Sequence, residues 1–235
     1  MSDSGNPARS EILGNIRRAL GVTGDDAARR ATVAARLANH APNLIPERAR
    51  EPRPLLLQRF RQMLEGQSAS VFEVDAADQI PAVVAQYLRG KNLPLQLRKG
   101  EDARLAALPW ANEPAVTLTA GRAGGEDPAG LSHATAGIAE TGTLVLTAGP
   151  ANPTTLNFLP PTHIVVIDES TIVGAIEDVW TRLRVQYGAA RMPRVVNFIS
   201  GPSRTADIEQ VLTLGAHGPV RLAVIILRAA ATDHK

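Results

Sequence analysis

The feature that most limits the fold of this chain is a series of short, almost continuously apolar runs separated by amphipathic segments. Residues 163–168 (HIVVID) and 220–227 (VRLAVIIL) are two such runs, and residues 170–184 (STIVGAIEDVWTRLR) read as a helix with Ser170 as N-cap. Strands that are apolar along their whole length are typical of a sheet that is covered on both faces. The pattern therefore predicts an α/β fold in which helices flank a central sheet.

This alternating pattern begins near Leu55 and divides the chain into two parts. Residues 7–21 space their apolar side chains as a helix does, and residues 22–54 are rich in Ala, Arg and Pro. We expect an N-terminal helix and arm over residues 1–54 and an α/β domain over residues 55–235. The charges of the arm indicate a solvated face, and a docking surface for a partner is the alternative.

The composition excludes several kinds of chemistry. The chain has no cysteine, which excludes disulfides, thiolate nucleophiles and cysteine-ligated zinc or iron–sulfur clusters on it. A formal net charge of +2 does not indicate nucleic-acid binding. No apolar run approaches the roughly 20 residues of a membrane span, and residues 1–10 (MSDSGNPARS) do not resemble a signal peptide. We expect a cytoplasmic protein that neither spans a membrane nor binds nucleic acid.

Three loops combine polar side chains with glycine beside predicted strands, where ligands of such sheets bind. The first is residues 132–143 (SHATAGIAETGT), in which Glu140 and Thr141 lie between Gly137 and Gly142. The two glycines permit positive φ and a close approach of a ligand to the backbone. Glu140 is a candidate base, nucleophile or ligand anchor. A carboxylate that only stabilises its own turn is an equally good interpretation.

The second loop is residues 199–209 (ISGPSRTADIE), which follows a predicted strand and opens a predicted helix (SRTADIEQVLTLG). Gly201 and Ser203 shape a tight entry, and Thr205 belongs to the same candidate ligand site. The free N–H groups of a helix start can bind an anion, and Arg204 adds a guanidinium suited to carboxylate or phosphate. A capped helix without a ligand is the alternative.

The third loop is residues 215–219 (GAHGP), where His217 lies between glycines just before the last predicted strand. A loop histidine can carry a proton or bind a metal, or it can simply hydrogen-bond its own loop. The spacing of His133, Glu140 and His217 matches no known ligand motif, so we expect no metal.

Four motifs in order resemble those of the lactate-utilisation protein C family, also called the LUD domain family. They are GIAETGTLVL, LPPTHIVVI, ISGPSRTADIE and GAHGP, within residues 117–227. The resemblance implies a three-layer α/β/α sandwich like that of sugar-phosphate isomerases and CoA transferases. It also implies a role in the oxidation of L-lactate to pyruvate, with two partner proteins that carry the iron–sulfur clusters. No cofactor is then expected on this chain, and a homo-oligomer is compatible with it.

One difference from the family lies in residues 147–160 (TAGPANPTTLNFLP). Relatives often carry an arginine in this segment, and this chain has no basic residue there. If that arginine binds a carboxylate in relatives, this chain binds a different ligand or uses Arg204. Asn152 and Thr154 replace part of the hydrogen bonding of an arginine and none of its charge.

We therefore expect a cluster-free subunit of a lactate-oxidising complex that binds a small anionic ligand. One alternative is an independent transferase or isomerase that acts on an acyl-CoA or a sugar phosphate through Glu140. Another is a regulatory scaffold with a degenerate site. The sequence leaves open whether the chain is itself an enzyme. The candidate site consists of Glu140 and His217 as catalytic residues and, as ligand-binding residues, Gly137, Thr141, Gly142, Gly201, Ser203, Arg204 and Thr205.

Overall fold

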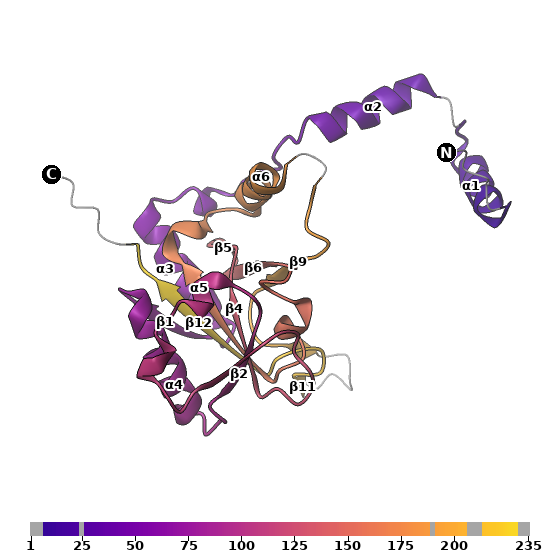
Figure 1. Cartoon of the computed structure of the whole chain (residues 1–235). Helices are drawn as coiled ribbons and strands as arrows, with labels where there is room; N and C mark the ends of the chain where they lie inside the picture. The colour runs from indigo at the N-terminus through magenta and orange to yellow at the C-terminus, as the bar shows by residue number, and fades with distance from the viewer. Residues whose placement is uncertain (1–6, 24–25, 189–190, 206–212, 230–235) are drawn as a thin grey trace. The chain divides into compact units, whose positions relative to one another are not determined.

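The computed structural model describes residues 7–23, 26–188, 191–205 and 213–229. The chain divides into two compact units, residues 1–43 and residues 44–235. Figure 1 shows the elements of both units.

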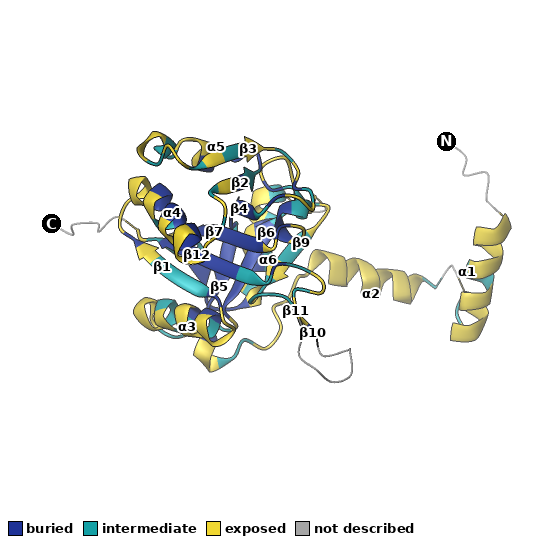
Figure 2. Ribbon diagram, turned by 90° about the horizontal axis from the view of Figure 1, so that it is seen from below, coloured by how far each residue is buried: buried dark blue, intermediate teal, exposed yellow. Residues whose placement is uncertain are grey.

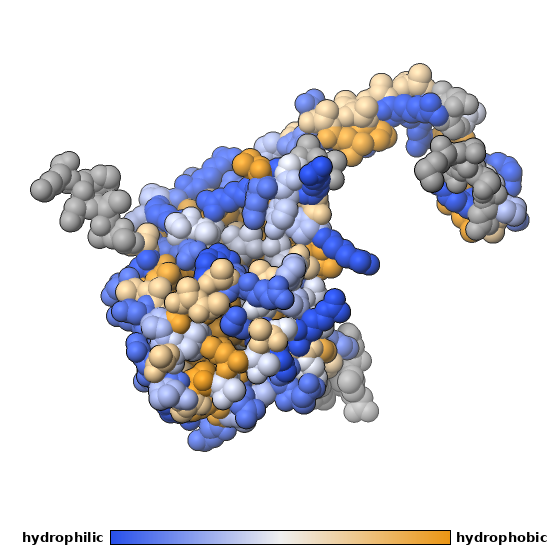
Figure 3. Space-filling model, in the orientation of Figure 1, coloured by the Kyte–Doolittle hydropathy of each residue, from blue (hydrophilic) through white to orange (hydrophobic). Residues whose placement is uncertain are grey.

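The first unit contains two amphipathic helices, α1 (Pro7–Leu20) and α2 (Ala27–Ala38). The N-terminal helix predicted from the apolar spacing is confirmed as α1. Asp26 caps α2, because its carboxylate accepts the backbone N–H of Arg29 at 3.0 Å. No described residue of either helix is buried (Figure 2), and in Figure 3 apolar side chains lie beside strongly polar ones along α2.

The second unit is built on a six-stranded sheet in the order β1-β12-β7-β4-β2-β3, and all of its paired strands are parallel. The two apolar runs that predicted buried strands form β7 and β12 in the interior of this sheet (Figure 2), which confirms the predicted α/β fold with a buried central sheet. The strands are β1 (Ser70–Val74), β2 (Gln96–Lys99), β3 (Thr117–Ala120), β4 (Ala129–His133), β7 (Thr162–Asp168) and β12 (Arg221–Leu227).

Helices α4 (Ile80–Gly90) and α5 (Ala103–Ala106) cover one face of this sheet. Val84 and Leu88 of α4 belong to the same buried cluster as Ile164 of β7. Burial of such aliphatic side chains contributes roughly 1.5–3 kcal/mol each, which makes this layer a main source of stability.

The opposite face is covered by helix α3 (Arg53–Gly66) and by a second, four-stranded sheet that the sequence pattern did not predict. Helix α6 (Ile176–Tyr187) packs against this second sheet through Val179 and Leu183. Two of its strands have only two or three residues, too few to show a periodic pattern. In spatial order the strands are β8 (Ile172–Val173), β5 (Ala136–Ile138), β6 (Thr143–Thr147) and β9 (Val196–Ile199).

The helix predicted to begin at Ser170 begins later, so that prediction was wrong at its start. Ser170 lies in a short 3₁₀ turn, and the two β-branched residues that follow Thr171 form strand β8 beside β5. Helix α6 then begins at Ile176, where the carboxylate of Asp178 accepts the N–H of Ala175 at 3.1 Å. Gly174 lies between the two elements, and a Cβ there would lie 1.8 Å from the carbonyl oxygen of Ala49.

Candidate functional site

Glu140 lies in the turn between β5 and β6, and its carboxylate has an arginine partner. Nη2 of Arg48 donates to Oε1 of Glu140 at 2.7 Å, and the Glu140 side chain is 13% exposed. The N–H of Glu140 donates to the carbonyl oxygen of Gly174 at 3.1 Å. The turn is therefore joined both to the segment before α3 and to the segment after β8.

The glycines of this turn lie against helix α3. A Cβ at Gly137 would lie 2.9 Å from Cζ of Phe60, and one at Gly142 would lie 2.6 Å from Cβ of Met63. Gly142 also has φ +61°, which favours glycine. At Gly142 the backbone of α3 and the positive φ together require glycine, whereas at Gly137, which belongs to β5, a Cβ would meet only side-chain ends.

A short chain of hydroxyl groups leads from this turn to the end of β9. Thr141 and Thr143 are hydrogen-bonded through their Oγ1 atoms at 2.6 Å, and Thr143 is hydrogen-bonded to Oγ of Ser200 at 2.7 Å. A Cβ at the next residue, Gly201, would lie 2.9 Å from Cβ of Gln67. The chain packs against the C-terminal end of α3 at that point.

Arg204 and Thr205 form strand β10, which pairs antiparallel with β11 (Thr213–Leu214). The helix predicted from Ser203 therefore does not begin there, and residues 206–212 of that prediction lie outside the described residues. Nη2 of Arg204 donates to the carbonyl oxygen of Gln67 at 2.7 Å and to Oγ of Ser68 at 2.6 Å. The guanidinium thus caps the end of α3.

Ser203 and His217 lie together and are joined through the backbone of His217. The backbone N–H of His217 donates to Oγ of Ser203 at 3.3 Å, and the N–H of Ser203 donates to the carbonyl oxygen of Pro219 at 2.8 Å. The His217 side chain is exposed beside a hollow of about 400 Å³ lined by Phe158 and Leu159.

The predicted site residues thus form two groups, one around Glu140 and Thr141 and one around Ser203 and His217. Among the described residues, no hydrogen bond or ion pair connects the Glu140 carboxylate directly with Ser203, Arg204 or His217. That they share one ligand pocket stays a prediction.

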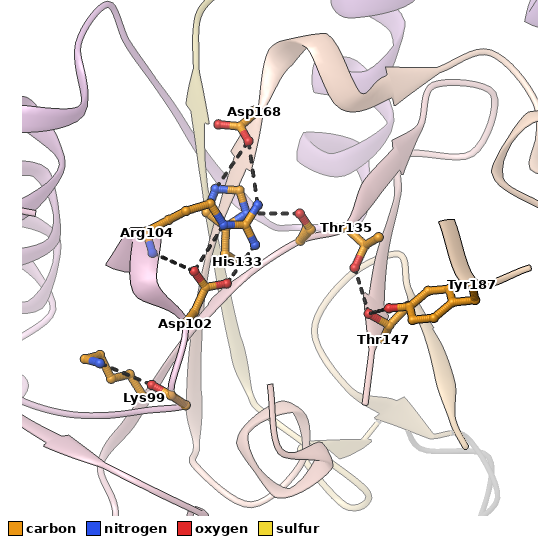
Figure 4. Close-up of polar contacts among 10 residues, drawn as sticks. Lys99, Asp102, Arg104, His133, Thr135, Thr147, Asp168 and Tyr187 are labelled. Atoms are coloured by element: carbon orange, nitrogen blue, oxygen red, sulfur yellow. Dashed lines mark hydrogen bonds and ion pairs between the residues drawn. The ribbon is translucent and has the colours of Figure 1, made fainter. Parts of the chain in front are cut away.

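A second polar cluster lies at the carboxyl ends of β4 and β7, where α/β sheets bind ligands (Figure 4). His133 is the last residue of β4 and Asp168 the last of β7, and His133 Nε2 lies 3.6 Å from Asp168 Oδ2. Asp102 caps α5 and holds Arg104 by two side-chain contacts, the shorter of 2.7 Å. Nη1 of Arg104 lies 3.8 Å from Asp168 Oδ2, and this contact connects the Asp102–Arg104 pair to Asp168 and His133.

The electrostatics of this cluster favour a neutral histidine between ionised partners. Burial lowers the pKa of His133, and the positive charge of Arg104 lowers it further. Nδ1 of His133 lies 3.0 Å from the carbonyl oxygen of Ala134, which can only accept, so Nδ1 carries the proton of the neutral ring. Nε2 is then unprotonated and makes no hydrogen bond to the carboxylate of Asp168, which is also an acceptor. The pKa of Asp102 is lowered by its bonds to Arg104, which outweigh its burial.

Sequence reasoning singled out His133 but missed Asp102, Arg104 and Asp168. Asp168 ends an apolar run, and Asp102 lies three residues after strand β2. Polar residues just after strands could have indicated a site at this edge of the sheet. No group of three or more His, Asp or Glu side chains in the described part of the chain has an arrangement suited to a metal ion. No described helix is long and apolar enough to cross a bilayer.

A separate set of hydroxyl groups lies between the segment after β4 and the second sheet. Oγ1 of Thr135 is hydrogen-bonded to Oγ1 of Thr147 at 3.0 Å, and the Tyr187 hydroxyl donates to Thr147 at 3.2 Å (Figure 4). Deeper in the sheet, Nε2 of His163 is hydrogen-bonded to Oγ of Ser132 at 2.9 Å. Burial lowers the pKa of His163 to about 3.

Comparison with known families identifies relatives of most of the second unit. The LUD domain model matches residues 57–227, which confirms the family resemblance. Lactate utilization protein C of Halalkalibacterium halodurans is 38% identical over 99 residues, 42% of this chain and 43% of that protein. Its counterpart in Shouchella clausii is 35% identical over 98 residues, with 42% and 43% covered. The match therefore spans less than half the length of these relatives.

Two further relatives extend the comparison. The uncharacterized protein NMB1437 of Neisseria meningitidis serogroup B is 38% identical over 173 residues, 73% of this chain and 66% of that protein. A crystal structure of a DUF162 family protein from Deinococcus radiodurans matches with a TM-score of 0.57 at 19% identity, covering 75% of this chain and 99% of that one. Likeness at such low identity supports the fold alone.

Proposed function

Because this chain belongs to the LUD domain family, we propose that it takes part in lactate utilisation as a cytoplasmic subunit without a redox centre. The observation that carries the proposal is the 38% identity to a relative named lactate utilization protein C. In this role the chain contributes to the oxidation of L-lactate to pyruvate by binding partners and a small anion.

The redox chemistry of this proposal has to come from partner proteins. Oxidation of lactate to pyruvate releases two electrons, and iron–sulfur clusters that accept them are held by cysteine thiolates. The chain has no cysteine. We therefore assign the clusters to iron–sulfur partners, and to this chain the task of positioning a ligand or docking those partners.

Two candidate positions for the anionic ligand of this subunit follow from the sequence motifs, and each has a partner in the fold. Glu140 is paired with Arg48, and Arg204 is bonded to Gln67 and Ser68. A ligand bound to Arg204 would have to replace these bonds. Arg204 can therefore bind a ligand only if its guanidinium leaves the end of α3. Both positions stay predictions.

Copurification tests the proposed function. The tagged full chain is isolated anaerobically from its native cells, and the product is examined by mass spectrometry, visible absorbance and lactate-dependent dye reduction. We expect a brown complex that contains cysteine-rich proteins and reduces the dye with L-lactate. The matched control omits lactate. A colourless protein recovered without partners would contradict the subunit role.

The alternative of an independent transferase that acts through Glu140 also stays a prediction. A covalent mechanism would leave an acyl or CoA adduct on Glu140 after incubation with an acyl-CoA, and intact-mass measurement detects it. We rank this function second, because the ion pair with Arg48 gives the carboxylate a structural task.

A further inference from the structure

A hollow of about 620 Å³ lies beside the ends of β2 and β3. We call it the arginine hollow, because Arg122 and Arg194 both line it, together with Glu101 and the apolar side chains of Pro150 and Pro153. Its volume is in the range of small-molecule sites, roughly 300–1,000 Å³.

The arginine hollow is built from three segments that the backbone holds together. Glu101 follows β2, and its N–H donates to the carbonyl oxygen of Pro150 at 2.9 Å. The N–H of Ala123, after β3, donates to Oγ1 of Thr155 at 3.0 Å. On the other side, the N–H of Ala148 donates to the carbonyl oxygen of Val195 at 2.9 Å. The hollow thus lies at the carboxyl ends of two parallel strands, where open α/β sheets bind ligands.

The charge at this hollow is unusual, because its two arginines lack partners. Within the described part of the chain, neither Arg122 nor Arg194 has a hydrogen bond or an ion pair through its guanidinium, although most arginines of this unit have one. Glu101 is the single acidic residue in the lining. Residues 147–160 supply one wall but no basic residue, so the positive charge comes from elsewhere in the chain.

A buried amide in the same wall also lacks partners. Asn152 lies between Pro150 and Pro153 in the sequence and is 5% exposed, and neither its Oδ1 nor its Nδ2 has a hydrogen-bond partner among the residues that the structure describes. An unpaired buried amide is costly, and such groups are normally satisfied by water or a ligand. Asn152 is not itself a lining residue, but it is a neighbour in sequence of Pro150 and Pro153, which are.

From this geometry we propose that the arginine hollow binds an organic anion through a carboxylate or phosphate group held between Arg122 and Arg194. The body of the ligand packs against Pro150 and Pro153. The hollow is larger than a molecule of lactate requires. The ligand class is therefore an organic anion that is larger than lactate and has an apolar part. This proposal goes beyond the proposed function, because the hollow and its arginines do not depend on lactate as the ligand.

Amide NMR titrations of the purified full chain test the proposal with four probes: acetate, inorganic phosphate, hexanoate and hexyl phosphate. We expect the two hexyl probes to bind more tightly than their head groups alone and to shift the amide signals of Gly149 and Thr154. Comparison of hexanoate with hexyl phosphate separates a carboxylate site from a phosphate site. Binding should weaken with added salt, because the arginines are exposed.

Charge variants make the test specific. Arg122→Gln and Arg194→Gln should each lower the affinity roughly tenfold, as expected for loss of one charge-assisted contact. Glu101→Gln should raise it several-fold, because it removes the one negative charge of the lining. Arg50→Gln, at an exposed arginine outside the lining, is the matched control and should leave the affinity unchanged.

Two outcomes would overturn the site: no shift with any of the four probes, or equal affinity in the wild-type chain and both arginine variants. The assay contains no partner protein. A failure here therefore leaves the copurification result unaffected, and a failed copurification leaves this site intact.

Discussion

Arg48 and Glu140 form an ion pair that joins the segment before α3 to the turn between β5 and β6. Nη2 of Arg48 lies 2.7 Å from Oε1 of Glu140, with 56% and 13% of the two side chains exposed. The carboxylate that stood out in the sequence as a possible ligand anchor thus has a definite structural partner. Because the arginine is largely solvated, the pair contributes little to the free energy of unfolding.

A double-mutant cycle with Arg48→Gln and Glu140→Gln measures this contribution. We expect a coupling energy of about 1 kcal/mol or less in urea unfolding at pH 7, since exposed pairs give values of that size. A coupling above about 3 kcal/mol would contradict this, because it is typical of a fully desolvated pair. If Glu140→Gln also abolishes a ligand response without loss of stability, the ligand-anchor interpretation gains support.

Gly142→Ala should be strongly destabilising, by about 2–4 kcal/mol. The new Cβ would lie 2.6 Å from Cβ of Met63, and the residue would keep a φ of +61° that alanine disfavours. The matched control is Gly66→Ala at the end of α3, where no atom lies within 4 Å of the new Cβ. That change should be neutral or stabilising by up to about 1 kcal/mol. Equal unfolding midpoints for both variants would contradict the packing argument.

His163 should make the fold sensitive to acid. Burial lowers its pKa from 6.5 to about 3, so between these values the unfolded chain holds a proton that the folded chain does not. The free energy of unfolding therefore falls as the pH falls through this window, by about 1.4 kcal/mol per unit. We replace His163 by Gln, which keeps a hydrogen-bonding side chain for Ser132. Between pH 7.5 and pH 5, the free energy of unfolding of His163→Gln should fall by about 2 kcal/mol less than that of the wild-type chain. Parallel pH profiles of the two chains would disprove this.

Arg104→Gln should raise the pKa of His133. After burial, the charge of Arg104 is the main cause that lowers this pKa, while Asp168 and Asp102 act in the opposite direction. An NMR titration of the His133 Cε1–H signal measures the change. Arg89→Gln, which removes an arginine paired with Glu113, is the control and should leave His133 unchanged. A downward movement of the pKa in Arg104→Gln would contradict the assigned cause.

The buried central sheet could be predicted because its inner strands are long, almost continuously apolar runs. The runs at 163–168 and 220–227 became the central strands β7 and β12. The small sheet could not be predicted, because β5 and β8 have only two or three residues and are defined by their neighbours. Tertiary pairing, not local propensity, turned the start of a predicted helix into β8.

The candidate site was less predictable than the fold, because charged partners come together from distant segments. Nothing near Glu140 in the sequence indicated Arg48, and nothing near Asp168 indicated Arg104. Likewise, Arg122 and Arg194 reach the wall formed by residues 149–155 only through the folded backbone. Motif spacing finds residues within one loop, whereas these contacts depend on the order of strands in the sheet.

The position of β12 has a consequence for biosynthesis. This strand follows both of its partners in the sequence, and it pairs with β1 on one side and β7 on the other, through registers such as Ser70 with Ala223. During translation the earlier strands leave the ribosome without the neighbour that should separate them. One edge of β1 and one edge of β7 then remain open to wrong partners until β12 emerges. A nascent chain of this topology has reason to depend on chaperones, and closure of its sheet is expected to be a slow, late event.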